Sequence, residues 1–122
     1  MNQMSDYIET PSGVKCYTVR MGEGEEAKMK DKVICHYTLW LSNKGERGAK
    51  IDSSHDRKEP FACQLGVGLI QGWSDGMVGM KPGGIREIHV PYSQGYGEKG
   101  IPGAIPGKTD LIFEIEYLQK GM

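Results

Sequence analysis

The sequence predicts an α+β domain in which a β-sheet packs against one short α-helix. Several segments alternate between apolar and polar residues, as strands with one buried face do. Only one segment carries its apolar residues at helical spacing. The chain also contains 18 glycines in 122 residues, about twice the average share of roughly 7%, which favours turns and bulges over long helices. Strands that flank a solitary helix are typical of the α+β class.

Five segments are expected to form strands. The clearest is 33–41, which is rich in β-branched and aromatic residues. Its odd-numbered residues, from Val33 to Leu41, share one face of the sheet. In a later strand, Ile88 and Val90 are expected to point inward. The five strands are residues 14–21, 33–41, 61–65, 85–90 and 111–118, and a short return segment begins at Ile51.

The helical pattern lies in residues 69–80, where Ile70, Trp73, Met77 and Met80 recur at spacings of three and four. Three glycines in this segment each cost a helix about 1 kcal/mol relative to alanine. We therefore expect the helix to depend on packing against the sheet. The Lys-Pro-Gly-Gly run that follows is a helix stop signal.

Two long loops and a polar arm complete the expected organisation. Residues 42–50 are polar and predict a loop, and residues 91–108 form a second loop rich in Gly and Pro. A loop of that length inside a compact domain is usually functional. Residues 1–12 are polar and include Pro11, so we expect a flexible arm without a regular element, followed by one folded domain at 13–120.

Charge and composition exclude several classes of partner. The chain has 15 basic and 16 acidic residues and a formal net charge of -1, so neither nucleic acid nor a membrane surface is an expected partner. No apolar run approaches the roughly 20 residues of a membrane helix, and the N-terminus lacks a signal-peptide pattern. A cytoplasmic protein is expected. Cys16, Cys35 and Cys63 are widely spaced and odd in number, which predicts free thiols that pack as small apolar groups.

Three motifs suggest other chemistry, and each fits poorly. A G-x-G-x-x-G pattern begins at Gly95, but the Pro-rich run after it cannot start the helix that a dinucleotide site requires. Residues 52–56 contain the residue types of a hydrolase triad, but triads are assembled from distant segments. His36, His55 and His89 lack companions at metal-ligand spacing. No metal and no cofactor are predicted.

The remaining candidate residues are aromatic and aliphatic, with a few hydroxyls and one carboxylate. A site without a nucleophile, a metal or a phosphate cradle suits simple binding or a reaction that needs no covalent chemistry. Rotation about an X-Pro bond is such a reaction. Its barrier comes from amide resonance and is about 18 to 20 kcal/mol, and the uncatalysed event takes roughly 10 to 100 s.

Seven motifs, in order along the chain, resemble the FKBP family of peptidyl-prolyl cis/trans isomerases, the receptors of tacrolimus and rapamycin. The similarity runs from about residue 12 to residue 119. The motifs are Cys35-His-Tyr-Thr38, Ile51-Asp-Ser-Ser54, Arg57 with Pro60-Phe61, Leu69-Ile-Gln-Gly-Trp73, Gly95-Tyr-Gly97, Pro102-Gly-x-Ile-Pro106 and Leu111-Ile-Phe-Glu-Ile115. Seven motifs in the right order are far more specific than any one of them.

The resemblance implies an antiparallel sheet that wraps as a half-barrel around the short helix, with a shallow apolar pocket between them. Trp73 would form the floor under a prolyl ring. Asp52 would face the bound amide and pair with Arg57, which would orient Tyr37. The residues with implied catalytic roles are Tyr37, Asp52, Phe61, Ile70, Trp73, Tyr96 and Phe113.

The resemblance also implies contacts with macrolides. The Ile70 backbone N–H and the Tyr96 hydroxyl would donate hydrogen bonds to ligand carbonyls. The implied binding set comprises Tyr37, Ile51, Asp52, Arg57, Phe61, Leu69, Ile70, Trp73, Tyr96, Ile101, Ile105 and Phe113.

The sequence departs from the family pattern on one side of this pocket. Leu39 stands where Gly is usual, Ile51 where Phe is usual, and Ala104 where the family has a bulkier aliphatic residue. Residues 42–50 form a longer loop than the family's, and Ile101 occupies a variable tip. We expect a looser pocket on that side, with the fold and the reaction unaffected.

The activity implied by the resemblance is that of a peptidyl-prolyl cis-trans isomerase, or rotamase (EC 5.2.1.8 type). It would accelerate X-Pro rotation in peptides and folding proteins by binding the twisted imide, with no covalent intermediate. The expected partners are proline-containing peptides, unfolded proteins and macrolides such as tacrolimus and rapamycin, and the chain is expected to be a monomer. Two alternatives remain: a macrolide- or peptide-binding module, and a folding chaperone with little turnover.

Overall fold

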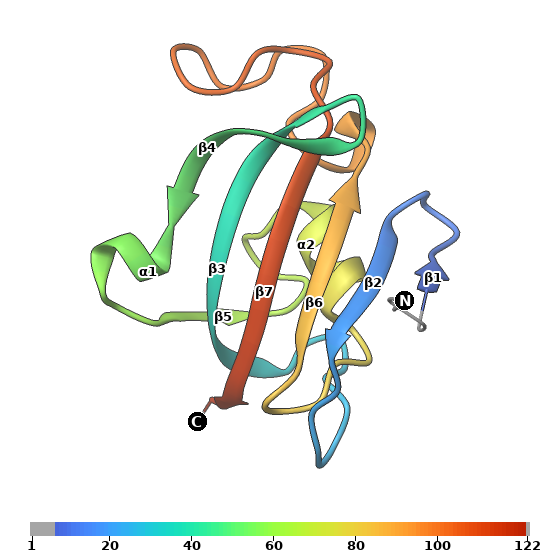
Figure 1. The fold of residues 1–122 in the computed structure, drawn as a ribbon. Coiled ribbons are helices and arrows are strands. Elements are labelled where there is room, and N and C mark those ends of the chain that lie inside the picture. The colour runs from blue at the N-terminus through green and yellow to red at the C-terminus, as the bar shows by residue number, and fades with distance from the viewer. Residues whose placement is uncertain (1–6, 122) are drawn as a thin grey trace.

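An antiparallel sheet forms the body of the protein (Figure 1). The computed structural model describes residues 7–121, and within that range the chain forms seven strands. The strands are β1 (Tyr7–Glu9), β2 (Lys15–Arg20), β3 (Lys32–Asn43), β4 (Glu46–Ser53), β5 (Phe61–Gln64), β6 (Ile85–Val90) and β7 (Leu111–Lys120). The helices are α1 (Ser54–Arg57), α2 (Gln71–Met77) and the 3-10 helix η1 (Tyr92–Gln94).

The strand order places the two longest strands, β3 and β7, side by side within the sheet. The order is β1-β2-β6-β7-β3-β4, and β5 also pairs with β3. Every described pairing is antiparallel. In Figure 1 α2 lies behind β6, and its buried residues join one core with those of β3, β6 and β7, so the helix covers one face of the sheet. The α+β prediction is therefore confirmed.

Helix α2 packs closely on strand β6 because two of its residues have no side chain. Gly72 lies against Val90, and Gly76 lies against Ile88. A Cβ atom at Gly76 would lie 2.5 Å from Ile88 Cγ2, well inside van der Waals contact. The glycines that weaken this helix on propensity alone therefore allow it to approach the sheet.

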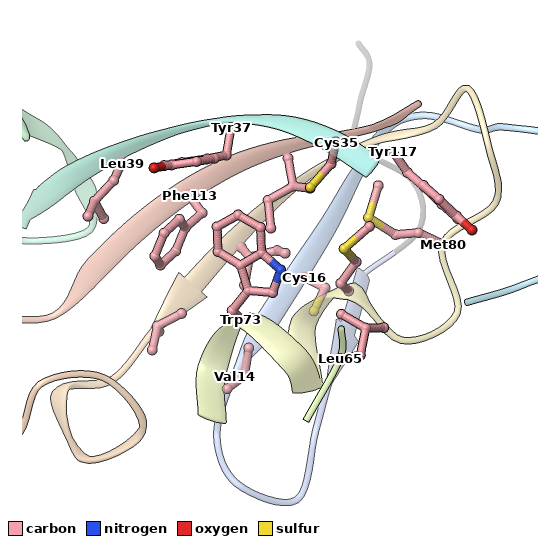
Figure 2. Close-up of a cluster of buried hydrophobic side chains, with 14 of the residues drawn as sticks. Val14, Cys16, Cys35, Tyr37, Leu39, Leu65, Trp73, Met80, Phe113 and Tyr117 are labelled. Carbon is pink, nitrogen blue, oxygen red and sulfur yellow. The ribbon is translucent and has the colours of Figure 1, made fainter. Parts of the chain in front are cut away.

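The core lies between α2 and the inner face of the sheet, as Figure 2 shows. The alternate β3 residues Val33, Cys35, Tyr37 and Leu39 are all buried, which confirms the face predicted for this strand. Strand β7 repeats the pattern with Leu111, Phe113, Ile115 and Tyr117. The two central strands therefore supply much of the apolar surface that holds the domain together.

A charged side chain shares this inner face. Arg86 lies two residues before Ile88 in β6 and is only 7% exposed. Its Nη1 donates hydrogen bonds to the carbonyl oxygens of Gly76 at 2.8 Å and Val78 at 3.0 Å. Burial lowers the pKa of Arg86, although an arginine remains charged at neutral pH. The guanidinium therefore satisfies carbonyl groups that the end of α2 leaves free.

The edges of the sheet differ from the sequence prediction. Tyr7–Glu9 pair with β2, where an arm without a regular element was expected; residues 1–6 of that arm lie outside the described residues. Residues 42–50 were predicted to be a loop, which is wrong, because β3 runs on to Asn43 and β4 returns from Glu46. Half of the β4 residues are exposed, one is buried, and the register of the strand shifts twice, so β4 lacks the alternation that indicates a strand.

The helices differ in length and number from the prediction. Helix α2 ends at Met77 instead of residue 80, because the backbone at Val78 turns to an extended conformation with ψ of 131°. Met80 is nevertheless buried. The short helices α1 and η1 were not predicted, since segments of four residues or fewer show no helical periodicity. Within residues 7–121, no helix has the length and apolar character needed to cross a membrane.

The cysteines pack as small apolar residues. Cys16 and Cys35 are buried, Cys63 is half-buried, and all three are free thiols. Burial raises the pKa of Cys16. The hydrogen bond with Cys63, together with burial, raises the pKa of Cys35. Both buried thiols therefore stay protonated at neutral pH.

Candidate functional site

A pocket of about 470 Å³ opens between the inner face of the sheet and the segment that leads into α2. Strand β3 contributes to one side, and β7, β5 and the loop after η1 contribute to the others. Among the described residues, its lining contains one ionisable carboxylate and is otherwise mainly aromatic and aliphatic. The lining residues are Tyr37, Leu39, Asp52, Phe61, Gly68, Leu69, Ile70, Trp73, Tyr96 and Phe113.

Trp73 forms the floor of the pocket. It is 4% exposed, and its ring meets those of Tyr37, Phe61 and Phe113 edge-on at centroid distances of 5.0, 5.5 and 5.3 Å. Edge-to-face contacts at such distances stabilise a fixed ring arrangement. Figure 2 shows the indole nitrogen on the side of the ring away from Phe113. Its N–H has no hydrogen-bond partner among the described residues, and the three ring contacts hold the indole as a rigid floor.

A β-bulge brings Asp52 to the pocket. Leu39 pairs with Asp52, whereas the next residue of β3, Trp40, pairs with Lys50, so Ile51 is the extra residue. Ile51 packs against the core and Asp52 lines the pocket. Two consecutive side chains therefore turn to the inner side, which regular alternation does not allow. The bulge is the local feature that aims the carboxylate at the site.

Asp52, Tyr37 and Arg57 form a hydrogen-bonded group at the polar end of the pocket. The Tyr37 hydroxyl donates to Asp52 Oδ2 at 2.5 Å. Arg57 Nη1 donates to Asp52 Oδ1, and Arg57 Nη2 donates to the Tyr37 hydroxyl oxygen at 3.0 Å. The implied pairing of Asp52 with Arg57, and the contact of Arg57 with Tyr37, are both present. Each polar group is held in one orientation by the other two.

The electrostatics of this group keep Asp52 ionised. Burial acts to raise the pKa of Asp52, but the hydrogen bonds from Tyr37 and Arg57 outweigh it and hold that pKa below its usual range. Burial and the neighbouring Asp52 raise the pKa of the Tyr37 hydroxyl. Burial, and to a lesser degree the charge of Asp52, also raise the pKa of Tyr96. At neutral pH the site therefore presents two protonated phenols and one carboxylate.

Replacing Arg57 with Ala should raise the pKa of Asp52 toward its ordinary value of about 3.9. The variant removes a hydrogen bond and a positive charge that favour the carboxylate. Because the pKa is lowered in the folded state, the pair adds stability at neutral pH that is lost as the pH falls through the lowered value. Carbon-detected NMR titration of the Asp52 carboxyl measures the shift.

Lys50→Ala is the matched control for this titration. Lys50 lies on β4, the strand that carries Asp52, and its Nζ is 2.8 Å from Asp56 Oδ2. The variant therefore removes a nearby positive charge but leaves the hydrogen bonds of Asp52 with Tyr37 and Arg57 in place. Asp52 should titrate in this variant as it does in the parent protein. An unchanged Asp52 titration in the Arg57 variant would contradict the assignment.

Eight of the twelve binding residues implied by the sequence line the pocket, and four lie apart. The eight are Tyr37, Asp52, Phe61, Leu69, Ile70, Trp73, Tyr96 and Phe113. Arg57 reaches the pocket only through Asp52 and Tyr37, and Ile51 packs against the core. Ile101 and the buried Ile105 line a separate hollow of about 390 Å³ in the Gly/Pro-rich loop. Their contacts with a ligand stay predictions.

Two lining residues, Leu39 and Gly68, were absent from the implied binding set, and Leu39 was named only as a departure from the family pattern on one side of the pocket. The alternation of β3 correctly predicted that Leu39 faces inward, but it could not show that Leu39 lines the pocket. The histidines lie elsewhere: His55 stacks on His36 at a centroid distance of 4.3 Å. His36 Nδ1 lies 2.7 Å from Ser54 Oγ, but Ser54 is fully buried and outside the lining, so this pair cannot attack a substrate in the pocket.

Comparisons with known proteins place the chain in a family. The family model for FKBP-type peptidyl-prolyl cis-trans isomerases matches residues 23–118. An FK506-binding protein of Neisseria meningitidis serogroup A is 46% identical over 99 residues, which cover 80% of this chain and 87% of that relative. A peptidyl-prolyl cis-trans isomerase of Schizosaccharomyces pombe is 40% identical over 108 residues, which cover 87% of this chain and 93% of that enzyme.

Solved structures agree with the sequence comparison. FkpA from Escherichia coli matches with a TM-score of 0.84 and 32% identity over 95% of this chain and 52% of that one. AtFKBP13 matches with a TM-score of 0.81 and 32% identity over 95% of this chain and 99% of that one. The chain therefore belongs to the family of FKBP-type peptidyl-prolyl cis-trans isomerases and is an enzyme of that class.

Proposed function

We propose that this enzyme accelerates X-Pro rotation by holding the twisted imide in the pocket above Trp73, with no covalent intermediate and no proton transfer. The observation that carries the proposal is the lining: aromatic and aliphatic side chains surround the pocket, and its one ionised group, Asp52, is already engaged by Tyr37 and Arg57. A prolyl ring stacked on the indole would bring its imide toward this polar end. Proline-containing peptides and unfolded proteins are the proposed substrates.

The physical chemistry of the imide favours such a lining. Planar amide resonance separates charge and is well solvated by water, whereas twisting the C–N bond removes resonance and leaves a less polar group. An apolar pocket therefore stabilises the twisted form relative to the planar one. The reaction is accelerated only by the extra stabilisation of the twisted imide relative to the planar one. Each additional stabilisation of about 1.4 kcal/mol gives a tenfold gain in rate.

Binding of tacrolimus and rapamycin is the second part of the proposal. The relative from Neisseria is named as an FK506-binding protein, and the pocket here has an apolar floor, the Tyr96 hydroxyl and the Ile70 backbone N–H in its lining segment. A ligand with an apolar ring and nearby carbonyls fits these groups. Monomeric state and cytoplasmic location stay predictions from the sequence.

A coupled proline-isomerisation assay, run with and without rapamycin, tests both parts together. We expect acceleration of cis-to-trans conversion in a proline tetrapeptide and its loss when rapamycin is added. A binding module without turnover would bind rapamycin but give no acceleration. A chaperone would suppress aggregation of an unfolded client equally well when rapamycin fills the pocket.

Changing His55 to Ala should leave isomerisation nearly unchanged. His55 stacks on His36 and lies outside the pocket lining, and the proposed mechanism uses no general acid or base. The assay is the same tetrapeptide assay, read as kcat/KM from pH 6 to pH 8. A severe loss of activity in this variant would overturn the mechanism.

A further inference from the structure

The described pocket has an order along its length. Trp73 forms the floor and contacts Phe113, Tyr37 and Phe61. Figure 2 shows Leu39 beyond Phe113, on the side away from Trp73. A side chain at that end cannot form part of the floor. It lies where the portion of a substrate that extends past a ring seated on the indole would pass.

Leu39 stands at that end between two pocket residues. It is 5% exposed and lines the pocket. Across the sheet it pairs with Asp52 of β4 and with Phe113 of β7. Directly opposite residues in antiparallel strands have Cβ atoms about 4.5 to 5.5 Å apart on the same face. The branched Leu39 side chain therefore lies next to the carboxylate group and forms an apolar wall there.

We propose that Leu39 sets the size of the residue accepted immediately before proline. The inference rests on the proposed function, in which the prolyl ring lies on Trp73. With the ring in that place and the imide toward Asp52, the chain on the N-terminal side of the imide runs past Asp52 and meets Leu39. A bulky side chain at this position and the Leu39 branch compete for the same space.

The argument predicts opposite effects for smaller and larger side chains. Leu39→Ala removes the branched end of the wall and leaves room for a large residue before proline. Leu39→Phe fills that room. One extra or missing methylene group in an apolar pocket changes discrimination between substrates by about 10- to 200-fold, so the change is measurable.

The test is a tetrapeptide series Ala-Xaa-Pro-Phe in which Xaa is Ala, Leu or Phe. In Leu39→Ala, the ratio of kcat/KM for Xaa = Phe to that for Xaa = Ala should rise at least about fivefold over the parent enzyme. In Leu39→Phe the same ratio should fall. Because each ratio is measured on one preparation, a loss of folded enzyme cancels.

Leu41→Ala is the matched control. Leu41 has the same side chain, lies two residues further on the same face of β3 and packs against the core, but it is absent from the pocket lining. In this variant the ratio of kcat/KM for Xaa = Phe to that for Xaa = Ala should equal the ratio in the parent enzyme. Leu39→Val, a milder change, should shift the ratio in the direction of the Ala variant and serves if the Ala variant fails to fold.

The outcomes separate the two proposals. A folded Trp73→Ala enzyme that keeps full activity refutes the proposed place of the prolyl ring, and this inference with it. An active, rapamycin-sensitive enzyme whose ratio is the same in the Leu39 variants and the parent refutes only the role of Leu39. A uniform change of KM for all three peptides also refutes it, because Leu39 would then contact the prolyl ring.

Discussion

Replacing Trp73 with Ala should lower kcat/KM by on the order of 100-fold, corresponding to about 3 kcal/mol of transition-state stabilisation. The indole is the floor of the pocket and the shared partner of three aromatic rings. Without it, the twisted imide loses its apolar surface and Tyr37, Phe61 and Phe113 lose the contact that fixes them. The measurement is the tetrapeptide assay, corrected for folded enzyme by circular dichroism.

Two further variants keep this prediction testable. Deleting a buried tryptophan side chain destabilises a protein by about 3 to 5 kcal/mol, so Trp73→Phe, which keeps an aromatic surface, should fold better and lose less activity. Trp40→Ala is the matched control. Trp40 lies on the outer side of β3 beneath the Arg47 guanidinium, 4.0 Å from it, and its loss should leave kcat/KM intact. Full activity in a folded Trp73→Ala enzyme would refute the assignment of the floor.

The second large effect is expected from Gly76→Ala, which should destabilise the protein by about 1 to 3 kcal/mol. Helix propensity alone predicts the opposite sign, a gain of about 1 kcal/mol. The close approach of α2 to β6 determines the sign of the effect, because the new Cβ would lie 2.5 Å from Ile88 Cγ2 and 2.9 Å from Ile88 Cδ1. Urea unfolding of the two proteins measures the difference in the free energy of unfolding.

A double-mutant cycle identifies the cause. Ile88→Ala removes the atoms that a Cβ at residue 76 would meet, so Gly76→Ala should be much less harmful in that background. Gln71→Ala, at an exposed position of the same helix, should change stability by less than about 0.5 kcal/mol. A stabilised Gly76→Ala protein would show that α2 does not pack on β6 as described.

The fold was predictable where one face of a strand meets the core. Strand β3 alternates between apolar and polar residues because Val33, Cys35 and Tyr37 are buried on one side. This alternation was sufficient to predict the strand and its buried face. Strand β4 was mistaken for a loop because little of it is buried and its register shifts twice. Alternation with Ile88 and Val90 places Arg86 on the inner face of β6, but it could not show what accommodates a charged group there, because that depends on the carbonyl groups at the end of α2.

The site was predictable from motifs but not from spacing. The resemblance named Trp73, Tyr37 and Asp52, and the structure brings all three to one pocket. Periodicity could not have placed Asp52, because the bulge at Ile51 interrupts the alternation of its strand. It also could not show that Leu39 borders the pocket, because that depends on how β3 pairs with β4 on one side and with the distant strand β7 on the other.

The outermost strands also affect how the protein behaves at high concentration. Within residues 7–121, strand β1 contains three residues, and the register of β4 at the opposite edge shifts twice. Neither offers a long row of free N–H and C=O groups on which another chain could add a strand. The sheet is therefore a poor template for edge-to-edge aggregation, a useful property for a protein proposed to meet unfolded chains.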